Sequence, residues 1–228
     1  MSVLFSQQTI DFLVENRLQN DKAWFEERRE QYNQLVLAPL VSLVEELTPT
    51  LLGIDDKLLC IPKIDKSISR IWRDARFSKD KSIFRDNMWC MFVRQKNVGL
   101  PEFFFVITPQ EFFYGCGYFA ASSASMESVR RLILNNDKSF KAALSVYKKH
   151  SEFQLEGEMY KRTRHPDAPD NLKLWLDRKS ICVMRTCTDF NLLYSNKLAA
   201  TIATDYKAIA PIYNFLMKAE DAIYQSNL

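Results

Sequence analysis

Glycine is scarce in this chain, with five residues among 228. Loops that cradle a phosphate with backbone N–H groups need several glycines at fixed spacing. Neither G-x-x-x-x-G-K-[ST] nor G-x-G-x-x-G occurs, and the single G-x-G, at residues 115–117, lies within an aromatic run. The sequence therefore contains none of the common Gly-rich nucleotide-binding loops.

Histidine is scarce and the cysteines are not paired. His150 and His165 lie in dissimilar settings without ligand-spaced partners, and no G-x-S-x-G occurs, so neither a zinc site nor a Ser-His-Asp triad is indicated. The five cysteines form no C-x-x-C pair, and Cys90, Cys116 and Cys182 lie in apolar runs. We expect reduced, non-catalytic thiols and a reducing compartment.

The chain also lacks a run of about 18 uninterrupted apolar residues, and its first residues lack the charged and apolar regions of a signal peptide. A net charge of +3, with 47% hydrophobic and 26% charged residues, is ordinary for a folded soluble protein. We therefore expect a cytoplasmic protein with no membrane partner. The composition points to no particular cofactor, metal or oligomeric state.

Hydrophobic periodicity predicts one α+β domain over residues 1–228. Helical spacing predicts helices over residues 6–19, 21–52, 122–134, 137–149 and 170–176, and one or two helices over residues 193–224. We expect a kink or break near Pro39 and an interruption near Pro211. Runs rich in Phe, Val and Ile, together with the charged segment discussed next, predict strands over residues 68–77, 88–94, 102–108, 111–119 and 179–186. Residues 153–162 are expected to be extended as well. Short links between consecutive strands predict a mainly antiparallel sheet, packed against helices from both chain ends.

One stretch, residues 70–85, combines charge and aromatic side chains more densely than the rest of the chain. It holds six Lys and Arg and two Asp around Trp72, Phe77 and Phe84. Residues 61–96 carry 10 Lys and Arg against 4 Asp and Glu, a balance of +6, whereas residues 1–60 have a balance of −5. A basic block in a nearly neutral chain indicates a local anionic partner.

Alternation along residues 70–77 predicts a strand with one charged face and one core face. The charged face comprises Arg70, Trp72, Asp74 and Arg76, and the core face Ile71, Ala75 and Phe77. A carboxylate between arginines orients their guanidinium groups and leaves other N–H donors free for an anion. We expect Asp74 to have this role, with Arg76 and Lys81 contacting the ligand. The alternative is a solvated lattice of ion pairs, each of which contributes little.

Residues 73–81 read R-D-A-R-F-S-K-D-K and resemble the R-D-x-R-F-[ST]-K-D-K motif of a mainly bacterial family, domain of unknown function 2461. Two further segments agree: residues 12–25 are similar to the F-L…N-N-x-x-W-F opening of that family, and residues 157–162 to its G-E-x-L-K-R segment. Ile83 and Arg85 stand where the family usually has Pro and Lys. Because the family has no assigned activity, the resemblance implies a family and a site but no reaction.

Two basic segments therefore supply the candidate site. The candidate ligand-binding residues are Arg70, Arg73, Arg76, Lys79, Lys81, Arg85, Lys161 and Arg162, and the candidate catalytic residues are Asp74, Asp80 and Glu158. Residues 160–185 have a balance of +4, which suggests a second wall of the same site. If residues 70–86 and 153–162 converge, these carboxylates and Glu156 can also bind Mg²⁺ beside a substrate phosphate.

Three functions remain open at this stage. The favoured one is binding of a phosphorylated or other anionic ligand, either a nucleotide or a nucleic acid, by the Arg and Lys side chains. The second is a carboxylate-and-lysine enzyme that acts on a phosphate ester, with or without Mg²⁺. The third is a non-catalytic interaction protein in which the charges form a structural lattice.

Overall fold

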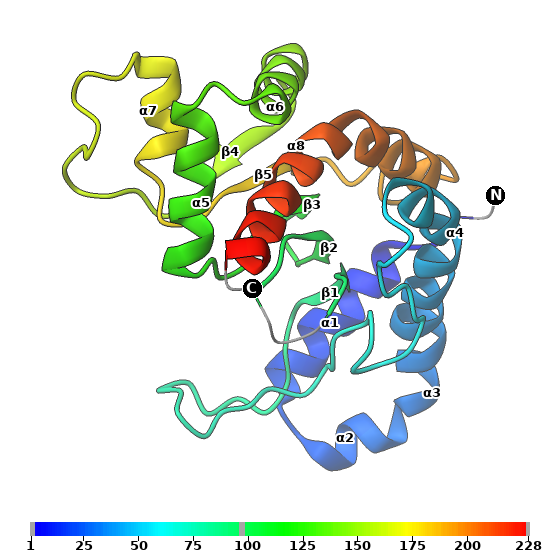
Figure 1. Ribbon diagram of the computed structural model, residues 1–228. Coiled ribbons are helices and arrows are strands. Elements are labelled where there is room, and N and C mark those ends of the chain that lie inside the picture. Colours follow the sequence, from blue (N-terminus) through cyan, green and yellow to red (C-terminus); the bar gives the residue numbers. More distant parts are fainter. Residues whose placement is uncertain (1–2, 96–98, 227–228) are drawn as a thin grey trace. The chain divides into compact units, whose positions relative to one another are not determined.

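The computed structural model describes residues 3–95 and 99–226 and has the α+β architecture that the sequence predicts (Figure 1). Among these residues, five strands form one sheet in the order β1-β2-β3-β5-β4. Its strands are β1 (Met88–Phe92), β2 (Glu102–Ile107), β3 (Phe112–Gly117), β4 (Gln154–Glu156) and β5 (Cys182–Cys187). β4 pairs antiparallel with β5, with Leu155 opposite Val183. The predicted antiparallel sheet is confirmed.

Side-chain caps mark the starts of three helices, which begin at Lys22, Ser123 and Lys138. Asp21 accepts a hydrogen bond from the Trp24 N–H, Ser122 from that of Ser125, and Asp137 from that of Ser139. The helices are α1 (Gln7–Gln19), α2 (Lys22–Glu27), α3 (Arg29–Tyr32), the π-helical turn η1 (Asn33–Leu37), α4 (Ala38–Ile54), α5 (Ser123–Leu134), α6 (Lys138–Lys149), α7 (Asp170–Leu176) and α8 (Leu198–Ser226).

Proline does not break the helices where the sequence predicts. The second helical region is interrupted at Arg28, which has φ −111° and ψ 14°, and it continues through Pro39. α8 runs through Pro211 without a break. A proline removes one backbone hydrogen bond, but buried side chains on both sides, such as Tyr206 and Tyr213, hold α8 in place.

The π-helical turn η1 precedes Pro39 and has a specific partner in α1. Pro39 has no N–H, so the carbonyl of Leu35 loses the donor that a regular helix would supply. The hydroxyl of Thr9 on α1 donates to that carbonyl at 2.8 Å. Thr9 is 1% exposed and the bond is partly buried.

We expect Thr9→Val to lower the free energy of unfolding by about 0.5–1.5 kcal/mol, because it removes a partly buried hydrogen bond to the Leu35 carbonyl. Thr9→Ser keeps the hydroxyl and is the matched control, with a smaller expected loss. Urea denaturation followed by circular dichroism measures both variants. A Thr9→Val protein as stable as the wild type would contradict this account of η1.

The helical segment Arg29–Ile54 is long and apolar enough to cross a membrane, judged by length and composition. The lack of an uninterrupted apolar run therefore does not exclude a spanning helix, contrary to the sequence argument. One such helix is weak evidence, because a core helix of a soluble protein passes the same test. Seven of its side chains are buried in the structure: Tyr32, Val36, Leu40, Leu43, Val44, Leu47 and Leu51. Cytoplasmic location and the lack of a membrane partner stay predictions.

The described residues fall into two compact units. Unit 1 is drawn from Met1–Phe92, Phe104–Tyr114 and Thr186–Thr204, and unit 2 from Val93–Phe103, Gly115–Arg185 and Asp205–Leu228. The organisation as a single domain stays a prediction.

Segments from both chain ends pack on β2, as predicted. In unit 1, Phe5 stacks on Phe105 with ring centroids 5.8 Å apart. In unit 2, Tyr206 and Tyr213 of α8 lie against Phe103, with centroids 4.9 and 4.7 Å away. These aromatic contacts give each unit a core that includes one part of β2.

All five cysteines are free thiols. Burial raises the pKa of Cys60 to about 11 and that of Cys182 to about 12. Cys90 and Cys116 are fully buried, and desolvation raises the pKa of each thiol further. Thiols with raised pKa values hold little nucleophilic thiolate at neutral pH, in agreement with the expected non-catalytic role.

Candidate functional site

The basic segment 70–85 lies in unit 1 and forms an irregular hairpin, not the regular strand that alternation predicts (Figure 1, cyan to green). Its two arms meet at the bridge between Trp72 and Phe84. The Arg73 N–H donates to the Ile83 carbonyl and the Arg85 N–H to the Ile71 carbonyl, both at 2.8 Å. The arms pair only over these few residues, so side-chain alternation holds there and fails in the loop beyond.

Phe77 is the clearest example of a loop residue that does not follow the predicted side-chain alternation. The strand interpretation places it on the core face, but its side chain is 95% exposed. Where the arms pair, the pattern is correct, because Ile71 and Phe84 are buried. Trp72 and Phe84 also pack against Phe25 of α2, with ring centroids 5.4 and 5.0 Å from it. An aromatic cluster thus anchors the base of the hairpin to α2.

Asp80 joins the two arms of the hairpin to α1. It accepts hydrogen bonds from the Ser82 N–H and hydroxyl at 2.9 and 2.6 Å, from Arg73 at 2.5 Å, and from Arg17 of α1. Ser82, followed by the two arginines, holds the pKa of the Asp80 carboxyl well below its usual range. Arg17 also donates to the Phe84 carbonyl at 2.9 Å. Asp80 is therefore ionised and links Arg73 and Ser82 of the hairpin to Arg17 of α1.

The loop of the hairpin has its own charge pairs. Asp74 binds the Arg76 guanidinium with both oxygens, at 2.9 and 2.6 Å, and this pairing holds the pKa of Asp74 well below its usual range. The Lys81 ammonium donates to the carbonyls of Ala75 and Arg76 at 3.2 and 3.4 Å, which closes the loop. Lys79 is exposed and makes no ion pair within the described part of the chain. Asp74 thus orients one arginine, Arg76, whereas Arg73 forms its ion pair with Asp80.

Arg85, on the second arm, is a half-buried cation that has no carboxylate partner among the described residues. Its guanidinium carbon lies 4.8 Å from the centre of the Trp89 ring, and its Nε is buried without a hydrogen-bond acceptor among residues 3–95 and 99–226. Burial, and then the positive charges of Arg73 and Arg70, lower the pKa of Arg85 from its ordinary value. Two predicted site residues, Arg70 and Arg73, therefore act electrostatically on a third, Arg85. We call these three residues the arginine cluster.

The positive charge near the cluster exceeds the negative charge that is paired with it. Asp65 pairs with Arg70 at 2.9 Å, and Asp80 is shared between Arg73 and Arg17. Counting these pairs, Arg85 and the Asp74–Arg76 pair, whose carboxylate interacts with Arg70, five guanidinium groups stand against three carboxylates. The surplus of two positive charges equals the full charge of a phosphate monoester.

The chain can now be compared with known proteins. The model of a family described as conserved hypothetical protein (DUF2461) matches residues 8–215. The chain belongs to this family. No curated protein matches it. The match includes the hairpin, α1 and unit 2 segments, so the resemblance inferred from short motifs extends over nearly the whole chain.

Two of the DUF2461-like segments meet in the structure. The side chain of Asn20, in the first segment, accepts a hydrogen bond at 2.7 Å from the Ile83 N–H, next to the basic motif. Asn20 has φ 48° and ψ 35° and ends α1, so the left-handed turn that stops the helix also directs this side chain toward the hairpin. The opening segment and the basic motif therefore form one local structure in this DUF2461 protein.

The third segment, residues 157–162, lies in unit 2. Gly157 has φ +122°, and an added Cβ would lie 2.0 Å from the Ser180 carbonyl oxygen, so glycine is required there. This turn ends β4, which explains why the predicted extended run stops at residue 156. Glu158 pairs with Lys179, while Lys161 and Arg162 are exposed. A shared site with the hairpin stays a prediction.

Sequence reasoning missed Arg17 and gave Asn20 no role beyond its place in the segment that resembles the family. Both lie at the end of α1 and are 67 and 63 residues from Phe84 and Ile83, the residues that they contact, and helical periodicity carries no information about such contacts. Within the described residues, no three His, Cys, Asp or Glu side chains are grouped so that they could hold a metal ion.

Proposed function

We propose that the hairpin binds a phosphorylated ligand, with Arg85 as the central contact and Arg70 and Arg73 beside it. The observation that carries the proposal is the half-buried Arg85 guanidinium, whose Nε has no acceptor in the described chain. A buried polar group without a partner is costly, and more so when like charges surround it. A phosphate oxygen supplies both the missing acceptor and the missing negative charge.

Binding is favoured over the enzyme alternative by the state of the candidate carboxylates. A general acid needs a raised pKa to hold its proton near neutral pH. The pKa values of Asp74 and Asp80 are instead lowered, by Arg76 for the first and chiefly by Ser82 for the second. Glu158 is engaged by Lys179. These three residues serve better as structural partners of cations than as proton donors.

The test is a calorimetric screen of nucleotides, sugar phosphates and short oligonucleotides at low salt. Charge-assisted hydrogen bonds contribute about 1.5–3 kcal/mol each, so we expect Arg85→Met to weaken phosphate binding about tenfold or more. Methionine keeps the apolar contact with Trp89 and removes the unpaired charge, so the free variant should be no less stable than the wild type. Lys79→Met, which removes an exposed cation, is the matched control.

Arg76→Ala tests whether the ligand binds at the loop of the hairpin or at the arginine cluster. Sequence reasoning favours Arg76 as a ligand contact, whereas the cluster proposal predicts little change in binding on its removal. Loss of binding in Arg76→Ala with none in Arg85→Met would contradict the cluster and move the site to the loop. If no anion binds the wild type more tightly than Arg85→Met, the charges are structural.

The exposed loop favours nucleic acid as a second candidate. Phe77 is 95% exposed, the Arg76 guanidinium lies 5.8 Å from its ring centre, and Lys79 is nearby in sequence. Single-stranded nucleic acids bind surfaces that combine an open aromatic ring with cations. In the same screen, this candidate predicts that oligonucleotides bind more tightly than mononucleotides and that Phe77→Ala removes the difference. Equal affinities would exclude it.

A further inference from the structure

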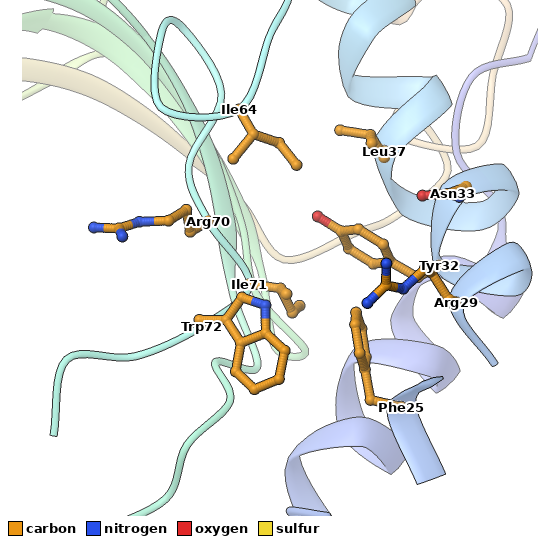
Figure 2. A pocket seen from close by; sticks show the side chains of 9 residues that line it. All are labelled: Phe25, Arg29, Tyr32, Asn33, Leu37, Ile64, Arg70, Ile71 and Trp72. Atoms are coloured by element: carbon orange, nitrogen blue, oxygen red, sulfur yellow. The ribbon is translucent and has the colours of Figure 1, made fainter. Parts of the chain in front are cut away.

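A cavity of about 230 Å³ lies in unit 1 between the α3–η1 helical region and the first arm of the hairpin (Figure 2). Its walls are largely apolar and include two aromatic side chains, Phe25 and Trp72, and the aliphatic side chains of Leu37 and Ile64. The ring centroids of Phe25 and Trp72 are 5.4 Å apart in an edge-to-face arrangement. Walls of this kind suit a small flat ring.

One polar group points into this apolar space. The Tyr32 side chain is 4% exposed, and its hydroxyl has no hydrogen-bond partner in the described part of the chain. Figure 2 shows the hydroxyl oxygen directed toward the gap between Ile64 and Leu37. Burial raises the pKa of Tyr32 to about 12, so the hydroxyl keeps its proton and is a donor. A ligand atom that accepts a hydrogen bond from this hydroxyl would supply the missing partner.

A cation lies on the same wall. The Arg29 guanidinium lies between Tyr32 and Phe25 in Figure 2 and faces the Trp72 side of the cavity. Its side chain is 59% exposed, and one terminal nitrogen, Nη2, bonds Glu26 at 2.5 Å. A guanidinium has five N–H donors, so this pairing leaves others for an acid group at the cavity mouth.

We infer that the cavity binds a small planar aromatic acid. The ring packs against Trp72 and Phe25, a polar ring substituent accepts a hydrogen bond from the Tyr32 hydroxyl, and the acid group pairs with Arg29. The shared chemistry is a flat ring with an anionic group, which a carboxylate or a phosphate monoester can provide.

This site differs from the arginine cluster, although Arg70 borders both. Arg70 lines the cavity, but its guanidinium points away from it in Figure 2 and pairs with Asp65 at 2.9 Å. Arg85 does not line the cavity, and neither Tyr32 nor Arg29 belongs to the cluster. The two proposals can therefore fail separately.

Saturation-transfer NMR on the full chain tests the inference with 4-hydroxybenzoate and 4-hydroxyphenyl phosphate as probes. The uncharged 4-hydroxybenzamide and the non-planar cyclohexanecarboxylate are the ligand controls. We expect both aromatic acids to bind more tightly than the controls, and the stronger of the two identifies the preferred acid group. Aromatic acids that bind no better than the amide would overturn the inference.

Variants locate the binding. Ile64 is 37% exposed at the cavity, so Ile64→Trp fills the mouth without entering the core, and it should weaken binding about tenfold or more. Arg29→Met should have a similar effect, and Tyr32→Phe a smaller one with the ring packing kept. Arg85→Met should bind the aromatic acids as the wild type does. Unchanged binding in a folded Ile64→Trp protein would overturn the inference, whatever the result for the arginine cluster.

Discussion

Replacing Arg178 with methionine should lower the free energy of unfolding by about 3–5 kcal/mol. The Arg178 side chain is 9% exposed and donates to the backbone carbonyls of Leu155, Gly157 and Leu174 at 2.6, 2.7 and 3.0 Å. Hydrogen bonds from a charged donor contribute about 1.5–3 kcal/mol each, with incomplete additivity. Methionine retains the apolar stem but leaves three carbonyls without this donor.

Urea denaturation of the purified variant measures the loss. Arg131→Met is the matched control, because Arg131 is exposed on α5 in the same unit and should change stability by no more than about 0.5 kcal/mol. An Arg178→Met protein within about 1 kcal/mol of the wild type would contradict the account. The result also concerns the family motif, because the carbonyl of Gly157 begins the G-E-M-Y-K-R segment that Arg178 holds.

The second large effect depends on pH and comes from Glu102, at the start of β2. Glu102 is 9% exposed, and burial raises the pKa of its carboxyl from 4.5 to about 7. The folded protein therefore holds a proton that the unfolded chain has lost between these pH values. Stability from this group is fully present below about pH 4.5, falls as pH rises to about 7, and stays low above it.

Glu102→Gln removes this titration. One pKa unit corresponds to about 1.4 kcal/mol, so at pH 8 the variant should be more stable than the wild type by about 3 kcal/mol, with little difference at pH 4.5. Urea denaturation at both pH values measures the change, and Glu111→Gln, on the other side of the β2–β3 turn, is a control at a less buried carboxyl. A difference that is the same at both pH values would show that burial of the charge is not its cause.

Local sequence signals predicted the regular elements well. Caps such as Asp21 and Asp137 mark helix starts because their side chains bond N–H groups two or three residues ahead. Breaks were predicted poorly, because a proline costs one bond locally while distant packing decides whether the helix continues. The donor that Thr9 gives to Leu35 is one such distant contribution.

The hairpin could not be predicted for the same reason. Alternation along residues 70–77 fits both a long regular strand and a short arm that pairs only near Trp72 and then continues into a loop. Which of the two forms depends on contacts from α1. Arg17 and Asn20 bind the second arm, and neither contact has a local sequence signature. The pattern was right at Ile71, where the arms pair, and wrong at Phe77, where they separate.

The sequence located the charged residues of the candidate site but did not determine their partners. Asp74 was expected to orient neighbouring arginines, and Asp80 was a candidate catalytic residue. The structure pairs Asp74 with Arg76 and Asp80 with Arg73, and it leaves Arg85 without a carboxylate in the described chain. Residue types alone favoured Arg76 as the ligand contact. Knowledge of the pairing shifts the proposal to Arg85.

The most direct test of the proposed anion site is a crystal structure of the protein soaked with tungstate, a heavy anion shaped like phosphate. The account predicts an anomalous peak within hydrogen-bonding distance of the Arg85 guanidinium, with Arg70 and Arg73 on its flanks, that is absent from Arg85→Met crystals. Peaks confined to other surfaces, with the Arg85 Nε bonded to a protein carbonyl or to water, would contradict it.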